Sequence, residues 1–566
     1  MRRLLTLFNL RDARRYYDEG VWTSDTLYSR VLHHASTRPD EYALRDATVR
    51  ITWRELLQWA DAVAEQLLQA GLRAGERVAV WMPSRAESMV MLAACARNGY
   101  VSVPSLHQNY TAVEILDLLD RTRASALVVQ PGYGADSNRR DVIPQAANLD
   151  HMKAVLTVGA SHPAGTPLVT HESGLRPSVP ADDDPDRVIY IAFTSGTTGA
   201  PKGVMHSHNT LLSNGRSLSE AWGIDHRTVL LSLSPMSHHI GTVAVEQMLA
   251  TGCEFVVNDL RAGKKLLDVV VDSGATYVMG VPTHGMDLLA HLKAREQNRL
   301  GSVKLFYMAG APIPSEVARS FLDMGVTPQN IYGMTENGSH QFTIPADDPK
   351  TIVETCGHAA RGFETRIFDQ NDPDIELGVH RVGEIATRGP LLMLGYFDNQ
   401  LTTEASFNRD GWFLSGDLGE LDERGCLRIV GRKKDLIIRG GHNIHPARIE
   451  DLAHRHPLVM KAAAFGVADD RLGEKVCLAV ILRGIDNVSG DAMLDHLHQA
   501  GLSRYDMPEY FAVLDAFPLT PSGKILKREL IEWTKSGRIE PKPVRFTRIP
   551  IGSSWPSNCR AWMSSR

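Results

Sequence analysis

The sequence predicts an α/β fold, with a large N-terminal domain built on mostly parallel, helix-covered sheets. Compact apolar runs alternate with helix-length stretches through the first half of the chain, a pattern typical of parallel sheets. The later sequence changes to short strands and Gly-rich turns, and then to a mixture of helices and strands. At 566 residues the chain exceeds one ordinary hydrophobic core, so we expect at least two domains.

The segment 76–105 illustrates the pattern of the first half. ERVAVWMP is predicted as a strand, and VSVPS as the start of another. Between them, Ser84 and Glu87 have the spacing of a capping box, which predicts a helix that runs to Gly99. Further strands are predicted at SALVVQ, AVLTVG, RVIYIAF, TVLLSLS, CEFVVN, ATYVMGV and KLFYMAG.

The second half is predicted to contain two smaller modules. From about Thr351, the runs RGFETRIFD, VGEIATRG and GCLRIVG indicate a β-rich module. Residues 449–530 mix helices with short strands, which indicates a compact α+β unit. The polar sequence after Trp533 predicts an irregular tail.

Composition narrows the classes of partner. The 61 Lys and Arg residues nearly balance 66 Asp and Glu residues, so the charge of −5 gives no reason to expect nucleic acid or an anionic membrane as partner. The six cysteines lie far apart, which argues against a disulfide framework or a zinc site and favours the cytoplasm. The N-terminal apolar run is short and followed by arginines, so we interpret it as mature protein, and no run is long enough to span a bilayer.

The stretch FTSGTTGAPKG is the strongest local signal. Glycines let the backbone approach a ligand closely, and amide N–H groups with hydroxyls bind phosphate oxygens. A surface hairpin is the alternative, but the apolar run before the loop predicts a buried strand that delivers it to a sheet end. A Walker A loop would require Ser or Thr after the lysine, where this chain has Gly203. The predicted phosphate-binding residues are Thr194, Ser195, Gly196, Thr197, Thr198, Gly199 and Lys202.

This stretch resembles the signature of the adenylate-forming superfamily, which includes acyl-CoA synthetases, luciferases and the adenylation domains of peptide synthetases. Further motifs of the family follow in order: AGAP, YGMTE, GWFLSGDLG, GRKKD and LTPSGKILKREL. The resemblance implies an ATP-dependent acid:CoA ligase with ATP, Mg²⁺ and coenzyme A. HQNYTAVEI, which begins at His107, is similar to ligases for medium-chain and cyclohexane-type acids.

The resemblance also implies roles for individual residues. AGAP would lie against the adenine, Tyr332 would pack on it, Thr335 would meet the phosphate and Glu336 would hold Mg²⁺. Asp417 and Arg432 would bind the ribose. The implied nucleotide-binding residues of these motifs are Gly310, Ala311, Pro312, Tyr332, Gly333, Met334, Thr335, Asp417 and Arg432.

Lys524 is the implied adenylation lysine, because a cation there would offset the repulsion between a carboxylate and a polyphosphate. The family rotates its small domain between two half-reactions, and the hinge would be Lys434. Arg439, Gly440 and Gly441 would then line the coenzyme A tunnel, although a tight turn explains the glycines nearly as well. The expected boundaries are 1–433 for the large domain, 434–541 for the small mobile domain and 542–566 for the tail.

The motif PMSHHIG corresponds to the segment that lies beside the substrate carboxylate in the family. His238 keeps the family's histidine and is assigned to gating or orienting the acid, whereas Ser237 replaces the usual aromatic residue. Peptide-synthetase domains place an Asp here to pair with an ammonium group, and its absence disfavours amino acids. VMGVPTHGM and MAGAP predict an apolar pocket for a hydrophobic acid. His206 and His208 are interpreted only as caps of the next helix.

Two residues depart from the family pattern: His442 and Arg448 stand where Glu is usual. They leave open an enzyme that performs one half-reaction only, from acyl-AMP to acyl-CoA. An acyl-AMP ligase that loads a carrier protein, a luciferase-like oxygenase and a non-catalytic nucleotide-binding protein also stay open. The particular acid is not predicted, and a homodimer stays open.

Overall fold

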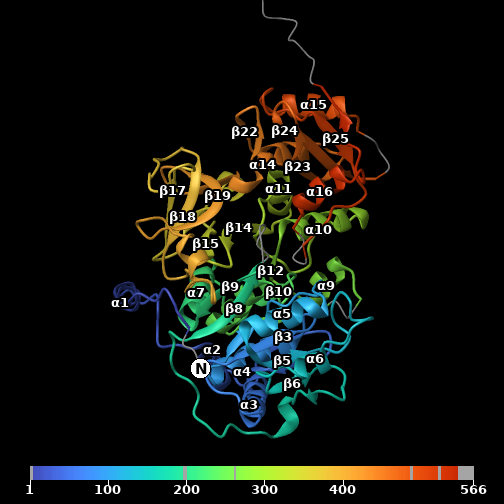
Figure 1. Cartoon of the computed structure of the whole chain (residues 1–566). Coiled ribbons are helices and arrows are strands. Elements are labelled where there is room, and N and C mark those ends of the chain that lie inside the picture. The colour runs from blue at the N-terminus through green and yellow to red at the C-terminus, as the bar shows by residue number, and fades with distance from the viewer. Residues whose placement is uncertain (1–3, 195–200, 260–262, 485–487, 521–523, 546–566) are drawn as a thin grey trace, which may run out of the picture. The chain divides into compact units, whose positions relative to one another are not determined.

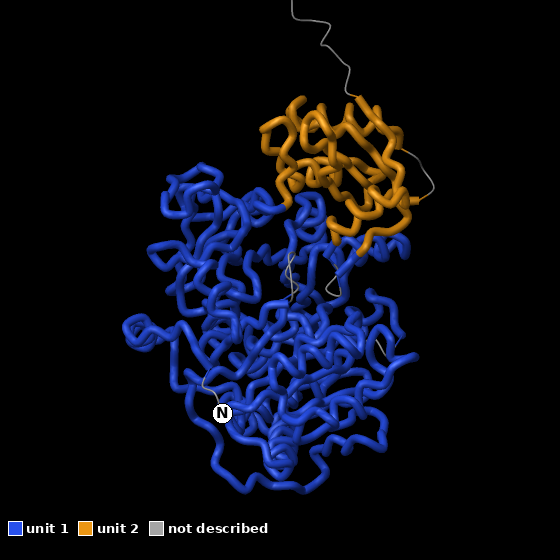
Figure 2. The backbone as a smooth tube through the Cα atoms, viewed as in Figure 1, with its two compact units in different colours: residues 1–434, 519–525 blue, residues 435–518, 526–566 orange. Residues whose placement is uncertain are grey.

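Two parallel-type sheets form the larger part of the protein, as the alternating pattern predicted (Figure 1). The computed structural model describes residues 4–194, 201–259, 263–484, 488–520 and 524–545. The chain divides into unit 1, Met1–Lys434 with Leu519–Ile525, and unit 2, Asp435–Pro518 with Leu526–Arg566 (Figure 2).

The first sheet of unit 1 has seven strands. In spatial order they are β7 (Thr166–Pro167), β6 (Ala154–Thr157), β5 (Ala124–Val129), β3 (Arg77–Trp81), β4 (Val101–Val103), β8 (Val188–Thr194) and β9 (Lys202–Ser207). All neighbours pair in parallel except β8 and β9, which form an antiparallel hairpin. This hairpin carries the two ends of the glycine-rich loop.

The second sheet of unit 1 has nine strands. In order they are β16 (His358–Ala359), β15 (Gly338–Phe342), β14 (Thr327–Met334), β13 (Leu305–Met308), β12 (Tyr277–Gly280), β10 (Val229–Ser232), β11 (Glu254–Val257), β1 (Tyr42–Arg45) and β2 (Arg50–Thr52). The pairings from β14 through β1 are parallel, and the strands at both ends are antiparallel. The predicted strands of the first half are therefore confirmed.

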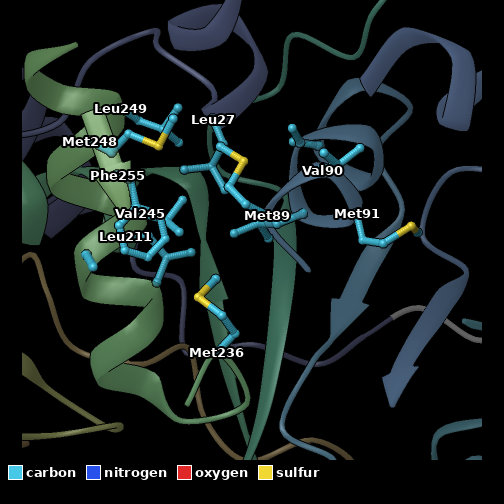
Figure 3. Packing of buried hydrophobic residues seen from close by; sticks show 14 of the residues in the cluster. Leu27, Met89, Val90, Met91, Leu211, Met236, Val245, Met248, Leu249 and Phe255 are labelled. Atoms are coloured by element: carbon cyan, nitrogen blue, oxygen red, sulfur yellow. The ribbon is translucent and has the colours of Figure 1, made fainter. Parts of the chain in front are cut away.

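Helices cover these sheets (Figure 1). The helices of unit 1 are α1 (Leu10–Asp18), which lies apart from the sheets in Figure 1, α2 (Leu27–Thr37), α3 (Trp53–Gln69), α4 (Ala86–Arg97), α5 (Ala112–Thr122), α6 (Ile143–Ala147), α7 (His208–Trp222), α8 (His239–Thr251), α9 (Leu266–Ser273), α10 (Pro282–Ala294), α11 (Ser315–Asp323), α12 (Pro349–Glu354) and α13 (Gln400–Glu404). Figure 3 shows side chains of α2, α4, α7 and α8 gathered in the largest buried cluster. Packing of this kind fixes the helices on the sheets, because burial removes apolar area from water.

The capping box predicted for α4 is wrong. The N-cap residue is Arg85, which makes no side-chain cap hydrogen bond. Glu87 is held instead by the Arg85 guanidinium, whose Nε donates to Glu87 Oε2 at 2.7 Å. Ser84 Oγ accepts from the Met236 N–H at 3.0 Å. A buried ion pair and a tertiary contact have replaced the local capping arrangement.

The predicted β-rich module is confirmed as a four-stranded antiparallel sheet of unit 1. Its strands are β17 (Glu364–Phe368), β18 (Gly383–Arg388), β19 (Phe413–Leu421) and β20 (Leu427–Arg432). A short 3-10 turn, Lys433–Asp435, follows β20, and unit 2 begins at Asp435.

Unit 2 is an α+β fold with a mixed six-stranded sheet. Its order is β22 (His442–Ile444), β21 (Ile437–Arg439), β24 (Gly473–Leu482), β25 (Tyr510–Val513) and β26 (Lys542–Pro543), and β23 (Val459–Asp469) pairs with β24. Helices α14 (Pro446–His454), α15 (Gly490–Gln499) and α16 (Lys527–Lys535) complete it. The prediction of only short strands is wrong, because β23 and β24 pair along 11 and 10 residues. The irregular tail starts later than expected, since α16 continues to Lys535.

Glu246 is a buried carboxyl on α8 that faces α7. Asn214 Nδ2 donates to Glu246 Oε2 at 2.6 Å, and a Cβ at Gly215 would lie 2.5 Å from the Glu246 carbonyl oxygen, so the helices are in close contact. Burial raises the pKa of Glu246 to about 8. The folded protein therefore holds this proton more tightly than the unfolded chain does.

We expect Glu246 to make stability depend on pH. Its contribution to the free energy of unfolding is complete below the pKa of the unfolded chain, near 4.5. This stabilisation is lost as the pH rises toward 8, by about 1.4 kcal/mol per pH unit. Glu246→Gln should remove this slope, so that its thermal midpoint falls less than that of the wild type between pH 6 and pH 8. The matched control is Glu220→Gln on the exposed side of α7, which should keep the wild-type slope. An unchanged slope in Glu246→Gln would contradict the protonated state.

Candidate functional site

Asp417, Arg432 and Tyr332 form one end of the candidate site. Asp417 on β19 and Arg432 on β20 are direct cross-strand partners. Arg432 Nε donates to Asp417 Oδ1, and the Tyr332 hydroxyl donates to Asp417 Oδ2, both at 3.0 Å. Burial raises the pKa of Asp417, while the Arg432 charge opposes this shift. The carboxylate is thus held in one orientation by two donors, as a group that binds hydroxyls requires.

A bulge in β14 shapes the segment that follows Tyr332. The register between β14 and β15 shifts between Tyr332 and Met334. A Cβ at Gly333 would lie 1.8 Å from the Gly338 carbonyl oxygen, so this position accepts only glycine. Asn337 Oδ1 accepts from the Met334 N–H at 2.9 Å. Close backbone contact therefore orients the two residues that come next, Thr335 and Glu336.

Glu336 meets Tyr396 and Lys202. The Tyr396 hydroxyl donates to Glu336 Oε1 at 3.0 Å. Lys202 Nζ lies 4.8 Å from the centroid of the Tyr396 ring, a cation–π contact, and its charge lowers the pKa of Glu336. Burial is the larger effect and raises that pKa above its usual value. Glu336 is accordingly a desolvated carboxyl that a cation would stabilise in its charged form.

Lys524 reaches the same region of unit 1. It lies in the segment Leu519–Ile525, where the Thr520 hydroxyl accepts from the Lys524 N–H at 3.0 Å. Its side chain passes Gly310, where a Cβ would be 2.7 Å from Lys524 Cε and 3.2 Å from Nζ. Burial lowers the pKa of Lys524 to about 8, Arg432 lowers it further, and Asp417 and Glu336 oppose the shift. The ammonium group is therefore within electrostatic range of both carboxylates.

His238 also lies within the influence of Lys524. It is the N-cap residue of α8, and its Nδ1 accepts from the Ile240 N–H at 3.3 Å. Burial and then the Lys524 charge hold the pKa of His238 well below its usual range. The neutral ring therefore carries its proton on Nε2, where it can donate a hydrogen bond.

The interpretation of His206 and His208 as helix caps is wrong. Ser207 is the N-cap residue of α7. His206 Nε2 donates to the Thr335 carbonyl oxygen at 2.7 Å, and its ring stacks on His239 with 5.6 Å between centroids. His208 Nδ1 accepts from the Leu27 N–H at 3.1 Å. His206 thus fixes the segment that carries Thr335, a role for which the neighbouring residues carry no signal.

The glycine-rich loop is only partly described. Thr194 and Lys202 are direct partners across the β8–β9 hairpin, so the ends of the loop are held together. Ser195, Gly196, Thr197, Thr198 and Gly199 lie outside the described residues. Ala311 and Pro312 follow Gly310 after β13 and are exposed.

The residues expected to bind coenzyme A lie in unit 2. Gly440 and Gly441 form the turn between β21 and β22 with φ values of +58° and +84°, which two-residue hairpins require. Arg439 pairs with Glu509 and donates to the Met507 carbonyl oxygen at 3.2 Å. The turn thus accounts for the glycines by itself. Lys434 is the last residue of unit 1 before the boundary.

The two residues that depart from the family pattern have partners within unit 2. His442 Nε2 lies 2.9 Å from Asp506 Oδ1. Arg448 Nη2 donates to the Gly501 carbonyl oxygen at 3.3 Å. Both side chains join one edge of unit 2 to the segment that follows α15.

The fold and this site define a nucleotide-dependent enzyme of the adenylate-forming kind, and comparison with known proteins bears this out. Residues 31–397 match the AMP-binding enzyme family, and residues 448–524 match the AMP-binding enzyme C-terminal domain. The chain belongs to the AMP-binding enzymes, so the resemblance that its motifs indicated is confirmed.

Particular relatives are similar along most of their length. A medium-chain fatty-acid–CoA ligase of Escherichia coli K12 is 29% identical, with 92% of each chain covered. A salicylyl-CoA synthase / salicylate adenylyltransferase of a Streptomyces species is 30% identical, with 92% of this chain and 95% of the relative covered. The crystal structure of ATP-bound MatB from Rhodopseudomonas palustris superposes with a TM-score of 0.78 at 29% identity, over 90% of this chain and 99% of that one.

The contact between Gly310 and Lys524 gives a specific prediction. Gly310→Ala would place a Cβ against Lys524 Cε at a φ of +89°, so the ammonium group must move. We expect adenylation, measured as acid-dependent pyrophosphate release, to fall roughly 10- to 100-fold. Gly325→Ala is the matched control, because Gly325 also has a positive φ of +75° but no atom within 4 Å of the added Cβ. Equal loss in both variants would mean that backbone strain alone is responsible.

Proposed function

We propose that the chain activates a hydrophobic carboxylic acid with ATP and transfers the acyl group to coenzyme A. Convergence of Lys524, Glu336 and Asp417 in one region of unit 1 is the observation that carries the proposal. The relatives support it, since they include a medium-chain fatty-acid–CoA ligase and a salicylyl-CoA synthase. ATP and coenzyme A are the co-substrates that this reaction requires.

In the first half-reaction a carboxylate oxygen of the acid attacks the α-phosphorus of ATP. A new O–P bond forms, the bond to the bridging oxygen breaks, and pyrophosphate leaves. Lys524 would stabilise the charge on the attacking and bridging oxygens, and Asp417 would hold the ribose hydroxyls. His238 would orient the acid through Nε2–H.

Glu336 would hold Mg²⁺. When bound, this ion would neutralise part of the phosphate charge. Magnesium in such sites takes one or two carboxylates together with substrate phosphates. A single desolvated carboxylate fits this requirement. Among the described residues, no group of three or more His, Cys, Asp or Glu side chains could hold a metal ion, so the phosphates would have to complete the coordination.

In the second half-reaction the thiol of coenzyme A attacks the acyl carbon, AMP leaves, and the thiol proton passes to solvent. Unit 2 would reorient about Lys434 for this step and present Arg439, Gly440 and Gly441. The proposed domains are those expected from the sequence, 1–433 and 434–541, with a tail from 542.

We also propose a reducing, cytoplasmic setting, which the five free cysteines of the described residues support. A separate finding is that none of the described helices is both long and apolar enough to cross a membrane.

The pKa of Lys524 predicts how adenylation depends on pH. The lysine acts as a cation, and its pKa of about 8 means that the cation is lost as the pH rises through 8. We therefore expect kcat/KM for pyrophosphate release, which reports the free enzyme, to decline above pH 8. A constant value up to pH 10 would contradict this role.

A panel of carboxylic acids, scored separately for pyrophosphate release and for acyl-CoA by mass spectrometry, tests the proposal. We expect at least one hydrophobic acid to give both products. Pyrophosphate release without formation of a coenzyme A thioester would indicate an acyl-AMP ligase that uses another thiol. A chain that converts supplied acyl-AMP but releases no pyrophosphate with any acid would indicate the half-reaction enzyme instead.

A further inference from the structure

A polar cluster borders the acid side of Lys524. His107 Nδ1 lies 2.8 Å from Ser237 Oγ, although the residues are 130 positions apart. Ser237 is followed directly by His238, whose pKa is lowered first by burial and then by the charges of Lys524 and His107. The part of the site where the acid is expected to bind is therefore not only apolar, as the sequence predicted. It also carries neutral hydrogen-bonding side chains.

The pair His107 and Ser237 keeps unused hydrogen-bonding capacity. If Ser237 donates to Nδ1, His107 still has a donor at Nε2 and Ser237 still has an acceptor. If Nδ1–H donates instead, Ser237 has the donor and Nε2 is the acceptor. Neither side chain has another hydrogen-bond partner among the residues that the structure describes. In both tautomers the pair thus offers one donor and one acceptor.

His107 is held in place by several elements. The Trp81 indole N–H at the end of β3 donates to the His107 carbonyl oxygen at 3.1 Å. Trp81 packs edge-on against Tyr133 at 5.8 Å, and a Cβ at Gly134 would lie 2.5 Å from the indole. Burial lowers the pKa of His107 to about 4, so the ring is neutral at pH 7. A fixed, uncharged polar group can discriminate ligands, because it cannot move to another partner.

Both side chains keep accessible surface even though burial lowers the pKa of the imidazole. The two side chains are therefore half-buried, with part of their surface left open to a ligand. The Cα atoms of Ser237 and His238 are about 3.8 Å apart, as consecutive residues are. The half-buried pair is therefore directly adjacent in the chain to the group that would orient the carboxylate.

We infer that the acid carries a hydroxyl group close to its carboxylate, and that the pair His107 and Ser237 binds this hydroxyl. The inference rests on the proposed function and names the substrate class of that same site. A hydroxyl can both donate and accept, so it can hydrogen-bond to Ser237 Oγ in either tautomer of the pair. An acid without it would cover Ser237 with hydrocarbon and leave its hydroxyl with an unsatisfied hydrogen-bonding position.

The test compares acids that differ only by a hydroxyl: benzoate with its 2-, 3- and 4-hydroxy derivatives, and octanoate with 3-hydroxyoctanoate. For the wild-type chain we expect kcat/KM for pyrophosphate release to favour a hydroxylated member of one series by roughly 10- to 100-fold. His107→Leu and Ser237→Ala should bring this ratio close to one, mainly through loss with the hydroxylated acid. If the two residues had a merely structural role, each substitution would lower kcat/KM equally for both acids of a pair.

His226→Leu is the matched control, because His226 is exposed and should leave the ratio unchanged. Ser237→Ala removes a single oxygen and carries the test if His107→Leu does not fold. Pyrophosphate release with equal kcat/KM in every pair would overturn the inference and leave the proposed function intact. A ratio that both variants preserve would also overturn it. Failure with every acid would overturn the proposed function and, with it, this inference.

Discussion

Lys524→Ala is expected to lower acid-dependent pyrophosphate release roughly 100- to 1,000-fold. Removal of one positioned donor from a desolvated site commonly has an effect of this size. The ammonium group lies against Gly310 and within the influence of Asp417 and Glu336, so its removal takes a positive charge away from the point where the reacting oxygens would lie. The measurement is steady-state pyrophosphate release with an acid that the wild type accepts.

The second half-reaction provides the internal control for this variant. When acyl-AMP is supplied, Lys524→Ala should form acyl-CoA at a rate within a few-fold of the wild type, because the lysine acts only on the phosphoryl step. Lys535→Ala, an exposed lysine on α16, should leave both half-reactions unchanged. Lys524→Arg keeps the charge but not the compact head, so intermediate activity is expected. Pyrophosphate release by Lys524→Ala at the wild-type rate would remove the lysine from the mechanism.

Glu336→Gln is expected to reduce adenylation about 100-fold at ordinary Mg²⁺ concentrations and to raise the Mg²⁺ concentration needed for half-maximal rate. The substitution preserves the shape and the acceptor for the Tyr396 hydroxyl at 3.0 Å, but it removes the charge that a divalent ion requires. The measurement is a magnesium titration of pyrophosphate release at saturating ATP.

Tyr396→Phe is the matched comparison for Glu336→Gln. It retains the carboxylate and removes only the hydrogen bond, so its magnesium requirement should change much less. A magnesium titration for Glu336→Gln that overlays the wild-type curve would exclude the carboxylate as a ligand, and the proposed metal site would have to be abandoned.

The fold was predictable because its signals are local. Buried strands such as β3 and β5 are continuous apolar runs. The close backbone contact at Gly333 became visible only in the fold. The order of the motifs indicated the family before any geometry was known. Asp417, Arg432 and Tyr332 were also predicted together, although their hydrogen bonds became visible only in the fold.

The rest of the site depends on contacts between distant residues. His206 reaches Thr335 across 129 positions, and His107 reaches Ser237 across 130. Neither pair follows a helix or strand period, so no local pattern could predict it. The capping box at Ser84 failed for the same reason, because the hydroxyl accepts from the distant Met236 N–H.

A crystal structure with a non-hydrolysable acyl-AMP analogue tests the central claim most directly. The account predicts that the ribose hydroxyls contact Asp417 and that the acyl carbonyl lies beside His238, with the phosphate near Thr335. A ligand bound at any other place in the protein, with Asp417 and Glu336 uncontacted, would contradict it.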